Sequence, residues 1–511
     1  MLFTEKLAVL REKASMTLQA LSEKTGLSIK AIMKIESGEV APSEEEIALL
    51  EAALGKDARS PFVPKPDYSM QFVWESYASE LMVEYRQSVE EGKDIEKYEG
   101  LFTSAARMEP GEIKEKLSDV IFEVVTNAPI REGYQYTEPS DLTSIRALRS
   151  RPVREEKAVF QGEELYDKIY GAWLGRIAGC LLGKPVEGIR TNELHPLLKE
   201  SGNFPMHRYI LSTDITDERA QNTKFPLKGR CYADTVDAMP VDDDTNYMVL
   251  AQILVEKYGR EFTSDDVMNV WLSYQGKNAY CTAERVAYVN FVKGFRPPHS
   301  ASYKNPYREW IGAQIRGDYF GYINPGNPEK AAEMAWRDAA ISHIKNGIYG
   351  EMFASAMIAQ AAVETDIEKI IQAGLGEIPS TSRLYEAITE IIADYNRGMT
   401  KEAAFSGIHA RWDEHSTHDW CHTISNAEIV AASLLYGKGD FGASISMAVE
   451  TGFDTDCNGA TVGSILGMRN GAWSLDDKWT QPLHDSLDTS IFGVGRVKIS
   501  DMAEKTMAHI G

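Results

Sequence analysis

The chain has 511 residues, of which 43% are hydrophobic, 25% charged and 10% aromatic. This is the composition of an ordinary globular protein, and it excludes a disordered, collagen-like or low-complexity chain. The net charge of −22 argues against a general polyanion binder, because phosphate-rich ligands would be repelled unless metal ions or local basic groups intervene. At roughly 150 residues per domain, the length predicts two or three domains.

The beginning of the chain and its cysteines bear on location. Glu5 and Lys6 interrupt the first apolar residues, so we expect no signal peptide. Apolar runs fall well short of the roughly 18 to 20 residues that a membrane span needs. The five cysteines have no CxxC spacing, which favours reduced thiols over a disulfide framework or a zinc ribbon. We therefore expect a cytoplasmic protein that does not bind membranes.

Residues 1–58 are predicted to form a small helical domain, because apolar residues recur there at helical spacing. The segment MTLQALSEKTGLSIKAIMKIESGEVAPS resembles the lambda-repressor-like, xenobiotic-response-element family of helix-turn-helix domains, with Gly26 in the turn. Residues 1–60 hold eight basic and ten acidic residues, so DNA binding would depend on dimerisation, and protein docking is the alternative. The resemblance implies a groove-facing set of residues: Ser28, Lys30, Ala31 and Lys34.

Residues 59–160 read as a linker and a helical extension. Prolines at 61, 64 and 66 predict a stiff linker. Helical stretches rich in aromatic and acidic residues follow to about residue 130, and GYQYTEPSDLTSIRALRSRP reads as an extended connector without chemistry of its own. Residues 161–511 are mostly helical by pattern, so the predicted fold class is all-α: a compact helical domain preceded by the helix-turn-helix domain.

A helix with four regularly spaced glycines begins the main domain, at positions 171, 175, 179 and 183. Glycine in a helix costs roughly 1 kcal/mol relative to alanine, so this stripe predicts that another backbone packs very close. Pro185 ends the helix and places Glu187 in the following loop. A core helix followed by an ordinary surface glutamate is the alternative interpretation.

Two acidic loops precede later helices. Asp242, Asp243 and Asp244 come directly before an apolar helix, and three adjacent carboxylates exceed what an N-cap requires. Asp454 and Asp456 precede a helix that again carries small residues at three- and four-residue intervals. Oxygen donors of this kind suit magnesium, manganese or calcium, and two such loops can share one or two ions. A solvated acidic helix start is the alternative for the first loop.

These three motifs together resemble the ADP-ribosylglycohydrolase family, which includes dinitrogenase reductase-activating glycohydrolase. The family pattern GxxxGxxxGDxxGxPxE is similar to residues 171–187, its DDT segment to residues 243–245, and its GGDTDT segment to residues 452–457. The resemblance covers roughly residues 165–510. It implies an all-α fold, a centre of two Mg²⁺ or Mn²⁺ ions and hydrolysis of a glycosidic bond at a ribose.

The resemblance also implies roles for particular residues. Glu187 and Asp243 would be catalytic, with Glu187 near the reacting ribose. Cys180 and Cys457 depart from the family pattern, and because a thiol is a poor ligand for hard cations they put one metal site in doubt. The implied metal ligands are Asp242, Asp243, Asp244, Asp454 and Asp456.

Further candidates rest on weaker signals. The expected substrate-binding residues are His343, Asn458, Gly452 and Trp420, although a purely structural histidine is the alternative at position 343. His418 and His422 are spaced to share a helical face, but a zinc site there needs a third ligand that the sequence does not identify.

The sequence thus predicts a metal-dependent hydrolase that removes ADP-ribose from a modified side chain, with arginine favoured, or cleaves a related ADP-ribosyl compound. One alternative is a hydrolase of small N-ribosides or nucleosides. Another is a helix-turn-helix regulator that senses ADP-ribose without cleaving it. The expected partners are an ADP-ribosylated protein or small ribosylated substrate, DNA through residues 1–58, and a second copy of the chain.

Overall fold

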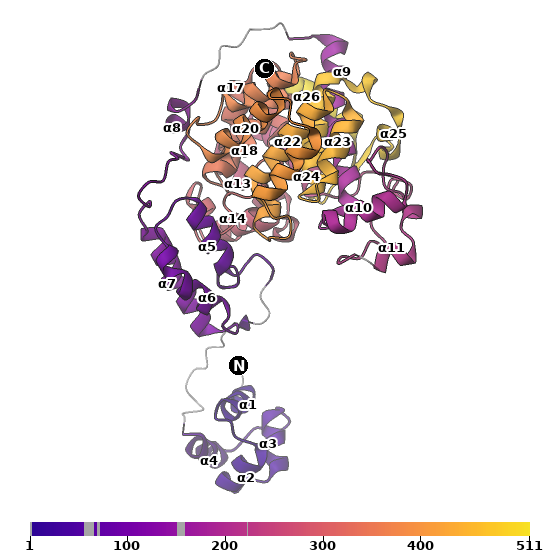
Figure 1. The fold of residues 1–511 in the computed structure, drawn as a ribbon. Coiled ribbons are helices and arrows are strands. Elements are labelled where there is room, and N and C mark those ends of the chain that lie inside the picture. The colour runs from indigo at the N-terminus through magenta and orange to yellow at the C-terminus, as the bar shows by residue number, and fades with distance from the viewer. Residues whose placement is uncertain (1–2, 56–65, 69–71, 151–158, 222) are drawn as a thin grey trace. The chain divides into compact units, whose positions relative to one another are not determined.

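The computed structural model describes residues 3–55, 66–68, 72–150, 159–221 and 223–511. It divides the chain into two compact units, residues 1–70 and residues 71–511. Both are built from helices (Figure 1), which confirms the predicted all-α class. The proline linker predicted from residue 61 onward lies mostly outside the described residues. Within the described part of the chain, every helix is too short or too polar to cross a membrane.

Four helices make up the first unit over its described residues, 3–55 and 66–68. Leu21, Ile32, Ile35 and Leu50 are buried in its small core. Gly26 ends the second helix in the left-handed region at φ +74°, a conformation that glycine adopts without strain. The helices are α1 (Phe3–Lys13), α2 (Leu18–Thr25), α3 (Ile29–Glu36) and α4 (Glu44–Leu54).

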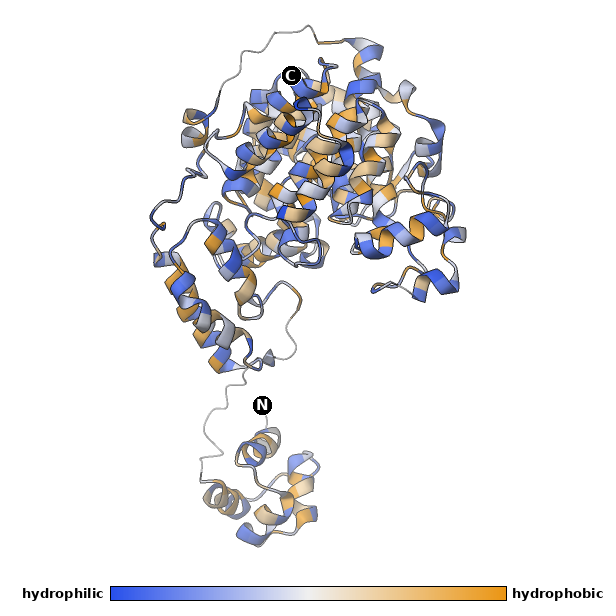
Figure 2. Ribbon diagram, in the orientation of Figure 1, coloured by the Kyte–Doolittle hydropathy of each residue, from blue (hydrophilic) through white to orange (hydrophobic). Residues whose placement is uncertain are grey.

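The second unit begins with a helical extension that has its own small core, which includes Phe102 and Ile121. Figure 2 shows hydrophilic and hydrophobic stretches alternating along these helices, as expected for amphipathic helices with one buried face. The predicted connector is not wholly extended, because a short helix interrupts it. The elements are the 3₁₀ turns η2 (Tyr77–Ser79) and η3 (Glu96–Tyr98) and the helices α5 (Leu81–Glu90), α6 (Glu99–Ala106), α7 (Glu112–Asn127) and α8 (Leu142–Ala147).

The remainder of the second unit is a large helical bundle. Its first half comprises α9 (Gly162–Gly183), η4 (Lys184–Val186), α10 (Thr191–Glu200), α11 (Asp217–Gln221), α12 (Asp243–Tyr258), α13 (Ser264–Tyr274), η6 (Lys277–Ala279), α14 (Thr282–Val292), α15 (His299–Ser302), α16 (Asp318–Tyr322) and α17 (Pro328–Ala339). Its second half comprises α18 (Lys345–Ala361), α19 (Ile367–Leu375), α20 (Arg383–Asn396), α21 (Lys401–Arg411), η7 (Asp419–Cys421), α22 (Thr423–Gly437), α23 (Phe441–Glu450), α24 (Thr455–Asn470), α25 (Asp477–Thr480) and α26 (Ile499–His509). A short antiparallel pair, β1 (Ser486–Asp488) with β2 (Arg496–Lys498), precedes the last helix.

Four helices of this bundle form its centre: α9, α18, α22 and α24 are buried over most of their length. A helix that is apolar on all sides belongs in the interior of a large domain. The neighbouring helices α22, α23 and α24 lie side by side in Figure 1 and pack against one another. The ends of α9, α12 and α24 carry the acidic motifs singled out from the sequence, so this centre positions the candidate site.

Candidate active site

The two glycine-rich helices, α9 and α24, pack directly against each other in antiparallel fashion. A methyl group on Gly175 would lie 2.1 Å from the carbonyl oxygen of Gly463, and one on Gly179 would lie 1.9 Å from that of Gly459. Real side chains do not tolerate such distances, so only glycine fits at these crossing points. The structure therefore confirms the close backbone approach and identifies each glycine stripe as the partner of the other.

This contact joins the end of α9 to the beginning of α24. The hydroxyl of Thr455 donates a hydrogen bond to the carbonyl oxygen of Gly183 at 3.0 Å. Lys184, Glu187, Asp454 and Asp456 consequently line one cavity of about 390 Å³. The acidic residues that line this cavity are Glu80, Glu187, Asp242, Asp243, Glu284, Asp454 and Asp456.

The aspartate triplet at the start of α12 is divided between structural and free oxygens. Asp242 is the N-cap: one of its oxygens accepts the Asp244 backbone N–H at 2.9 Å and the other accepts Lys184 Nζ at 2.5 Å. Asp244 is buried and accepts Arg176 Nη2 at 2.9 Å through Oδ1, but its Oδ2 has no hydrogen-bond partner among the described residues. Asp243 faces the cavity.

The second acidic loop also contains both hydrogen-bonded and free carboxylate oxygens. The Asp456 Oδ1 atom is buried and lacks a hydrogen-bond partner within the described part of the chain. Asp454 Oδ2 accepts the Cys421 thiol at 3.7 Å. An unpartnered buried carboxylate oxygen is costly, so Asp244 and Asp456 need a positive or hydrogen-bonding group that the described side chains do not provide.

Crowding among the carboxylates perturbs their titration. Repulsion by Asp456, followed by burial, raises the pKa of Glu187 well above its ordinary value, although its side chain is exposed at the cavity mouth. Burial, with repulsion from Asp242 and Asp456, raises the pKa of Asp243 to about 8. Burial alone would raise the pKa of Asp242, but Lys184 holds it below its usual range. Positive charge at the free oxygens would relieve this repulsion.

The donor set fits hard divalent cations. Free oxygens of Asp244 and Asp456 and the cavity-facing Asp243 and Asp454 are the ligand type that magnesium and manganese prefer. Two buried thiols lie close enough to these carboxylates to share a metal ion with them. Cys180 lies beside Asp242 and Asp244, and Cys457 lies beside Asp244 and Asp456. Burial raises the pKa of both thiols well above the ordinary value. The neutral thiol is a poorer metal ligand than the thiolate.

The predicted substrate-binding residues occupy different places. Trp420 lines the cavity, and the Arg190 guanidinium lies 4.5 Å from the centre of its ring. Asn458 is fully buried and donates to Asn426 Oδ1 at 2.7 Å. Gly452 has φ +69°, and a side chain there would clash with Glu414.

His343 also lies apart from the cavity wall. It is fully buried, and its Nδ1 is 2.9 Å from the Ser342 hydroxyl. Gly452, Asn458 and His343 are absent from the described lining of the cavity.

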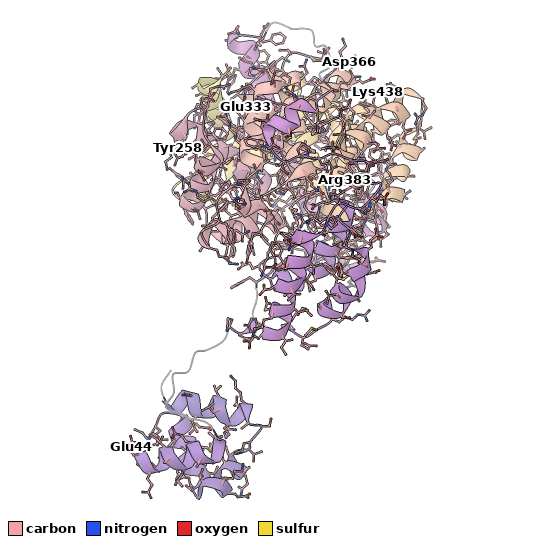
Figure 3. The ribbon with its side chains drawn as sticks, turned by 90° about the vertical axis from the view of Figure 1, so that its left-hand side faces the viewer. Glu44, Tyr258, Glu333, Asp366, Arg383 and Lys438 are labelled. Carbon is pink, nitrogen blue, oxygen red and sulfur yellow. The ribbon has the colours of Figure 1, made fainter. Side chains whose placement is uncertain are left out.

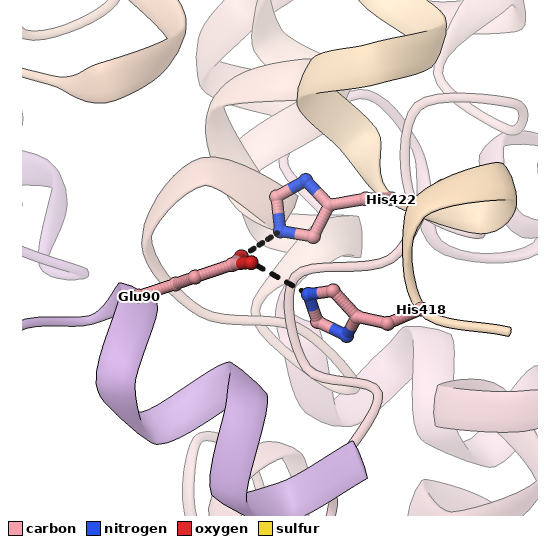
Figure 4. A group of neighbouring side chains, drawn as sticks. All are labelled: Glu90, His418 and His422. Carbon is pink, nitrogen blue, oxygen red and sulfur yellow. Dashed lines mark hydrogen bonds and ion pairs between the residues drawn. The ribbon is translucent and has the colours of Figure 1, made fainter. Parts of the chain in front are cut away.

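A second group of chemically active side chains lies at the seam between the extension and the bundle (Figure 4). Glu90, at the end of α5, points at both His418 and His422, with Oε2 to Nε2 distances of 3.0 and 3.7 Å. It is the third residue that the sequence did not supply for a zinc site. Its position is 328 residues from His418, so no local pattern indicates it.

Hydrogen bonding argues against a metal at this group. The Trp310 indole N–H donates to His418 Nδ1 at 3.2 Å, and the Ile424 backbone N–H donates to His422 Nδ1 at 3.1 Å. Each Nδ1 is thus an acceptor, which leaves the proton of the neutral ring on Nε2, facing Glu90. A metal-ligating histidine has the opposite arrangement, with the distal nitrogen donating a hydrogen bond. The group is a hydrogen-bonded seam.

The first unit places its predicted DNA-contacting residues on α3. The Ser28 hydroxyl caps this helix by accepting the Ala31 backbone N–H at 3.2 Å. Lys34 Nζ pairs with Glu39 at 2.5 Å. Lys30 is exposed.

A second cavity, of about 620 Å³, shares Trp74, Glu187, Thr417 and Trp420 with the acidic one. Its charge is of the opposite sign over part of the wall, where Arg190, Lys224 and Arg230 line it. Glu193 lines the same cavity, so its wall carries charges of both signs. Glu187 contributes to the walls of both cavities.

Comparison with known proteins defines the class. The sequence profile of ADP-ribosylglycohydrolase matches residues 161–510, and a helix-turn-helix profile matches residues 7–59. The second unit is therefore a hydrolase of the glycosidase type. The chain belongs to the ADP-ribosylglycohydrolase family, with a lambda-repressor-like helix-turn-helix domain at its N-terminus.

The other comparisons add little to this assignment. One similar solved structure is an ADP-ribosylglycohydrolase-related protein complex, with 17% identity and a TM-score of 0.43 over 68% of this chain and 98% of that one. No curated protein matches the chain.

Proposed function

We propose that the second unit hydrolyses a ribosyl glycosidic bond and that its preferred substrate carries ADP-ribose on a side chain, arginine above all. The observation that carries this proposal is the convergence of Glu187, Asp243, Asp454 and Asp456 on one cavity. The boundary near residue 161 that separates this catalytic domain from the extension belongs to the same proposal.

The family generally depends on divalent metals. We infer that Asp243, Asp244, Asp454 and Asp456 would hold two Mg²⁺ or Mn²⁺ ions, whereas Asp242 contributes less because Lys184 and the Asp244 N–H already occupy its oxygens. Such ions, when bound, supply Lewis acidity next to the sugar.

The residues of the chain would support the reaction in three ways. In hydrolysis the bond from the anomeric carbon to the aglycone breaks, the water oxygen bonds to that carbon, and a proton ends on the aglycone. Glu187 is placed at the cavity mouth to take the proton from water or to deliver it to the leaving group. The surrounding carboxylates stabilise the oxocarbenium character of the sugar, and Trp310 and Trp420 exclude water.

The basic wall of the second cavity favours a substrate with phosphate groups. Arg190, Lys224 and Arg230 bring positive charge next to Glu187 in a protein whose net charge is −22, although Glu193 lines the same cavity. A diphosphate is attracted by such a wall, whereas an uncharged nucleoside gains nothing from it. ADP-ribosyl compounds are therefore preferred over the small-nucleoside alternative.

Glu187→Gln tests the assignment. We expect the magnesium-loaded variant to release ADP-ribose from ADP-ribosyl-arginine about 100-fold to 10⁴-fold more slowly, because positioned acid–base groups contribute about that much. Metal content, measured by equilibrium dialysis, should stay at the wild-type level. Glu164→Gln, at an exposed position on α9, is the matched control.

Unchanged turnover in Glu187→Gln would contradict the catalytic role. A parallel panel of nucleosides separates the substrates: release from nucleosides without release from ADP-ribosyl-arginine would favour the small-riboside alternative. Metal-dependent binding of ADP-ribose without any turnover would favour the sensing regulator.

DNA binding is a second candidate function, supported by the helix-turn-helix match and by exposed Lys30 on α3. The weak charge of the first unit makes it depend on two copies of the chain. A salt-dependent shift of the protein's own promoter DNA, reduced in Lys30→Ala, would support it. A shift that survives this substitution would direct attention to other residues of α3.

A further inference from the structure

One aromatic residue in the wall of the acidic cavity comes from outside the family domain. Trp74 belongs to the extension, before α5, and it lines both the acidic cavity and the second, basic one. Glu80, six residues later, lines the acidic cavity as well. The family profile begins at residue 161, so the extension adds these side chains to a site that the family domain does not complete alone.

Trp74 is held in place from one side. The Arg285 guanidinium lies over its ring at 4.9 Å from the centre and donates to the Val73 carbonyl at 3.4 Å. Lys277, on η6, forms an ion pair with Glu75 and lies 4.7 Å from the centre of the Phe72 ring. Both cations belong to the bundle, so the segment before α5 is fixed to the wall of the cavity.

The backbone at Trp74 is unusual. Its φ is +64°, in the left-handed region that bulky residues rarely adopt. Such a conformation persists only where the surrounding structure enforces it. The Trp74 side chain lines both cavities.

The extension itself is anchored through buried charges. Arg308 donates to Glu91 at 2.6 Å and to both oxygens of Glu84 at 2.9 and 3.0 Å, and Glu90 accepts His418. Glu84 and Glu91 are buried, and Glu90 is half-buried, on α5 or directly after it. Trp74 therefore belongs to a fixed wall, and a ligand that reaches from Glu187 along either cavity passes its ring.

We propose that Trp74 is a specificity-determining residue that stacks on a planar heterocyclic base of the substrate, while Glu80 accepts hydrogen bonds from groups on that base. The ligand class is a base-bearing riboside, either a nucleoside or the nucleotide portion of an ADP-ribosyl compound. The inference rests on the proposed function, which places the ribose at Glu187. Tyr307, Trp310 and Trp420 complete the aromatic surroundings of the base.

The test measures binding, so that it is independent of turnover. Titration calorimetry with magnesium present compares ADP-ribose, adenosine and ribose 5-phosphate on the full chain. A stacked base is worth about a tenfold gain in affinity or more, so Trp74→Ala should weaken the base-bearing ligands at least tenfold and leave ribose 5-phosphate unchanged. Trp74→Phe should retain most of the affinity.

The controls separate stacking from folding. Trp473→Ala removes a tryptophan that is 73% exposed and absent from the described lining of both cavities, and it should bind all three ligands as the wild type does. Preference for ADP-ribose over adenosine would assign the base to the ADP portion, and the reverse would assign it to a nucleoside.

Three results would overturn the proposal: unchanged affinity in Trp74→Ala, an equal loss for ribose 5-phosphate, or failure of the wild type to bind either base-bearing ligand. Wild-type binding without hydrolysis would instead count against the proposed function alone. The two failures are therefore distinguishable.

Discussion

Two interfaces position the candidate site: one is a contact between backbones, and the other a contact between charged side chains. Between α9 and α24 the side chains are nearly absent, and backbone meets backbone at Gly175, Gly179, Gly459 and Gly463. Between the extension and the bundle the contact consists of buried charged side chains, such as Arg308 with its glutamates. The first interface fixes the carboxylates within tight steric limits. The second interface holds Trp74 beside these carboxylates through buried charge pairs. Loss of either partner of such a pair leaves the other as an unpaired buried charge.

The charged interface extends beyond Arg308. Arg383, at the start of α20 and labelled in Figure 3, binds Glu309 at 2.7 Å and Glu138 of the connector at 2.9 Å. Glu309 also accepts the Gln87 side chain at 2.6 Å. The predicted connector thus carries an anchoring carboxylate, although its sequence gave no sign of chemistry.

Removal of one buried charge from the interface between the extension and the bundle should have the largest effect on the stability of the protein. Arg308→Met leaves Glu84 and Glu91 buried without their main counter-charge, and we expect the free energy of unfolding to fall by about 3–5 kcal/mol. Urea denaturation measures the change. A double variant that also carries Glu84→Met should lose less than Arg308→Met alone, because fewer unpaired charges stay buried.

The matched control for this prediction is Lys116→Met. Lys116 is 73% exposed and pairs with Glu112 on the surface of α7, so its loss should cost less than about 1 kcal/mol. A loss of that small size in Arg308→Met would mean that the charged seam does not hold the extension.

Addition of one methyl group tests the glycine interface. Gly179→Ala would place its methyl group 1.9 Å from the Gly459 carbonyl oxygen, where neither backbone can yield easily. We expect a loss of about 2–3 kcal/mol in the free energy of unfolding. We also expect lower metal affinity, because a shift of α24 would move Asp456, which lies in the first turn of that helix.

Gly100→Ala provides the contrast. Gly100 is in α6 and has no heavy atom within 4 Å of the added methyl group. Since alanine is the better helix former, this variant should be stabilised by about 0.5–1 kcal/mol. Equal effects at the two glycines would contradict the interpretation of α9 and α24 as a backbone contact.

Acid should weaken the charged seam by a smaller amount. Burial, only partly offset by Glu90, lowers the pKa of His422 to about 3. The unfolded chain, with an ordinary histidine pKa near 6.5, therefore takes up the proton first as the pH falls. The stabilising contribution is complete above about pH 6.5 and is lost between there and pH 3.

We expect wild-type protein to lose roughly 2 kcal/mol more than His422→Gln when the pH is lowered from 7 to 5. Denaturant unfolding at the two pH values measures the difference. His299→Gln, at an exposed position, serves as the control and should behave as the wild type. Parallel pH profiles for wild type and His422→Gln would show that His422 does not contribute to the acid sensitivity of the seam.

The sequence by itself determined the features that local spacing encodes. The four-residue glycine stripe follows from helical geometry, and the close backbone approach that it predicts is confirmed. The aspartate triplet predicts the start of a helix, and α12 begins within it, at Asp243, with Asp242 as the N-cap. The all-α class, the helix-turn-helix domain and the family assignment also followed from local patterns.

Only the tertiary structure decided which of these patterns meet and what they meet. The α9 and α24 stripes are almost 300 residues apart, Glu90 meets a histidine 328 residues away, and Trp74 reaches the cavity from outside the family domain. No periodicity encodes such contacts, because they depend on how whole helices pack. The same packing leaves Asp244 and Asp456 with free oxygens and raises the pKa of the Cys180 and Cys457 thiols, since burial, and not residue type, sets those properties.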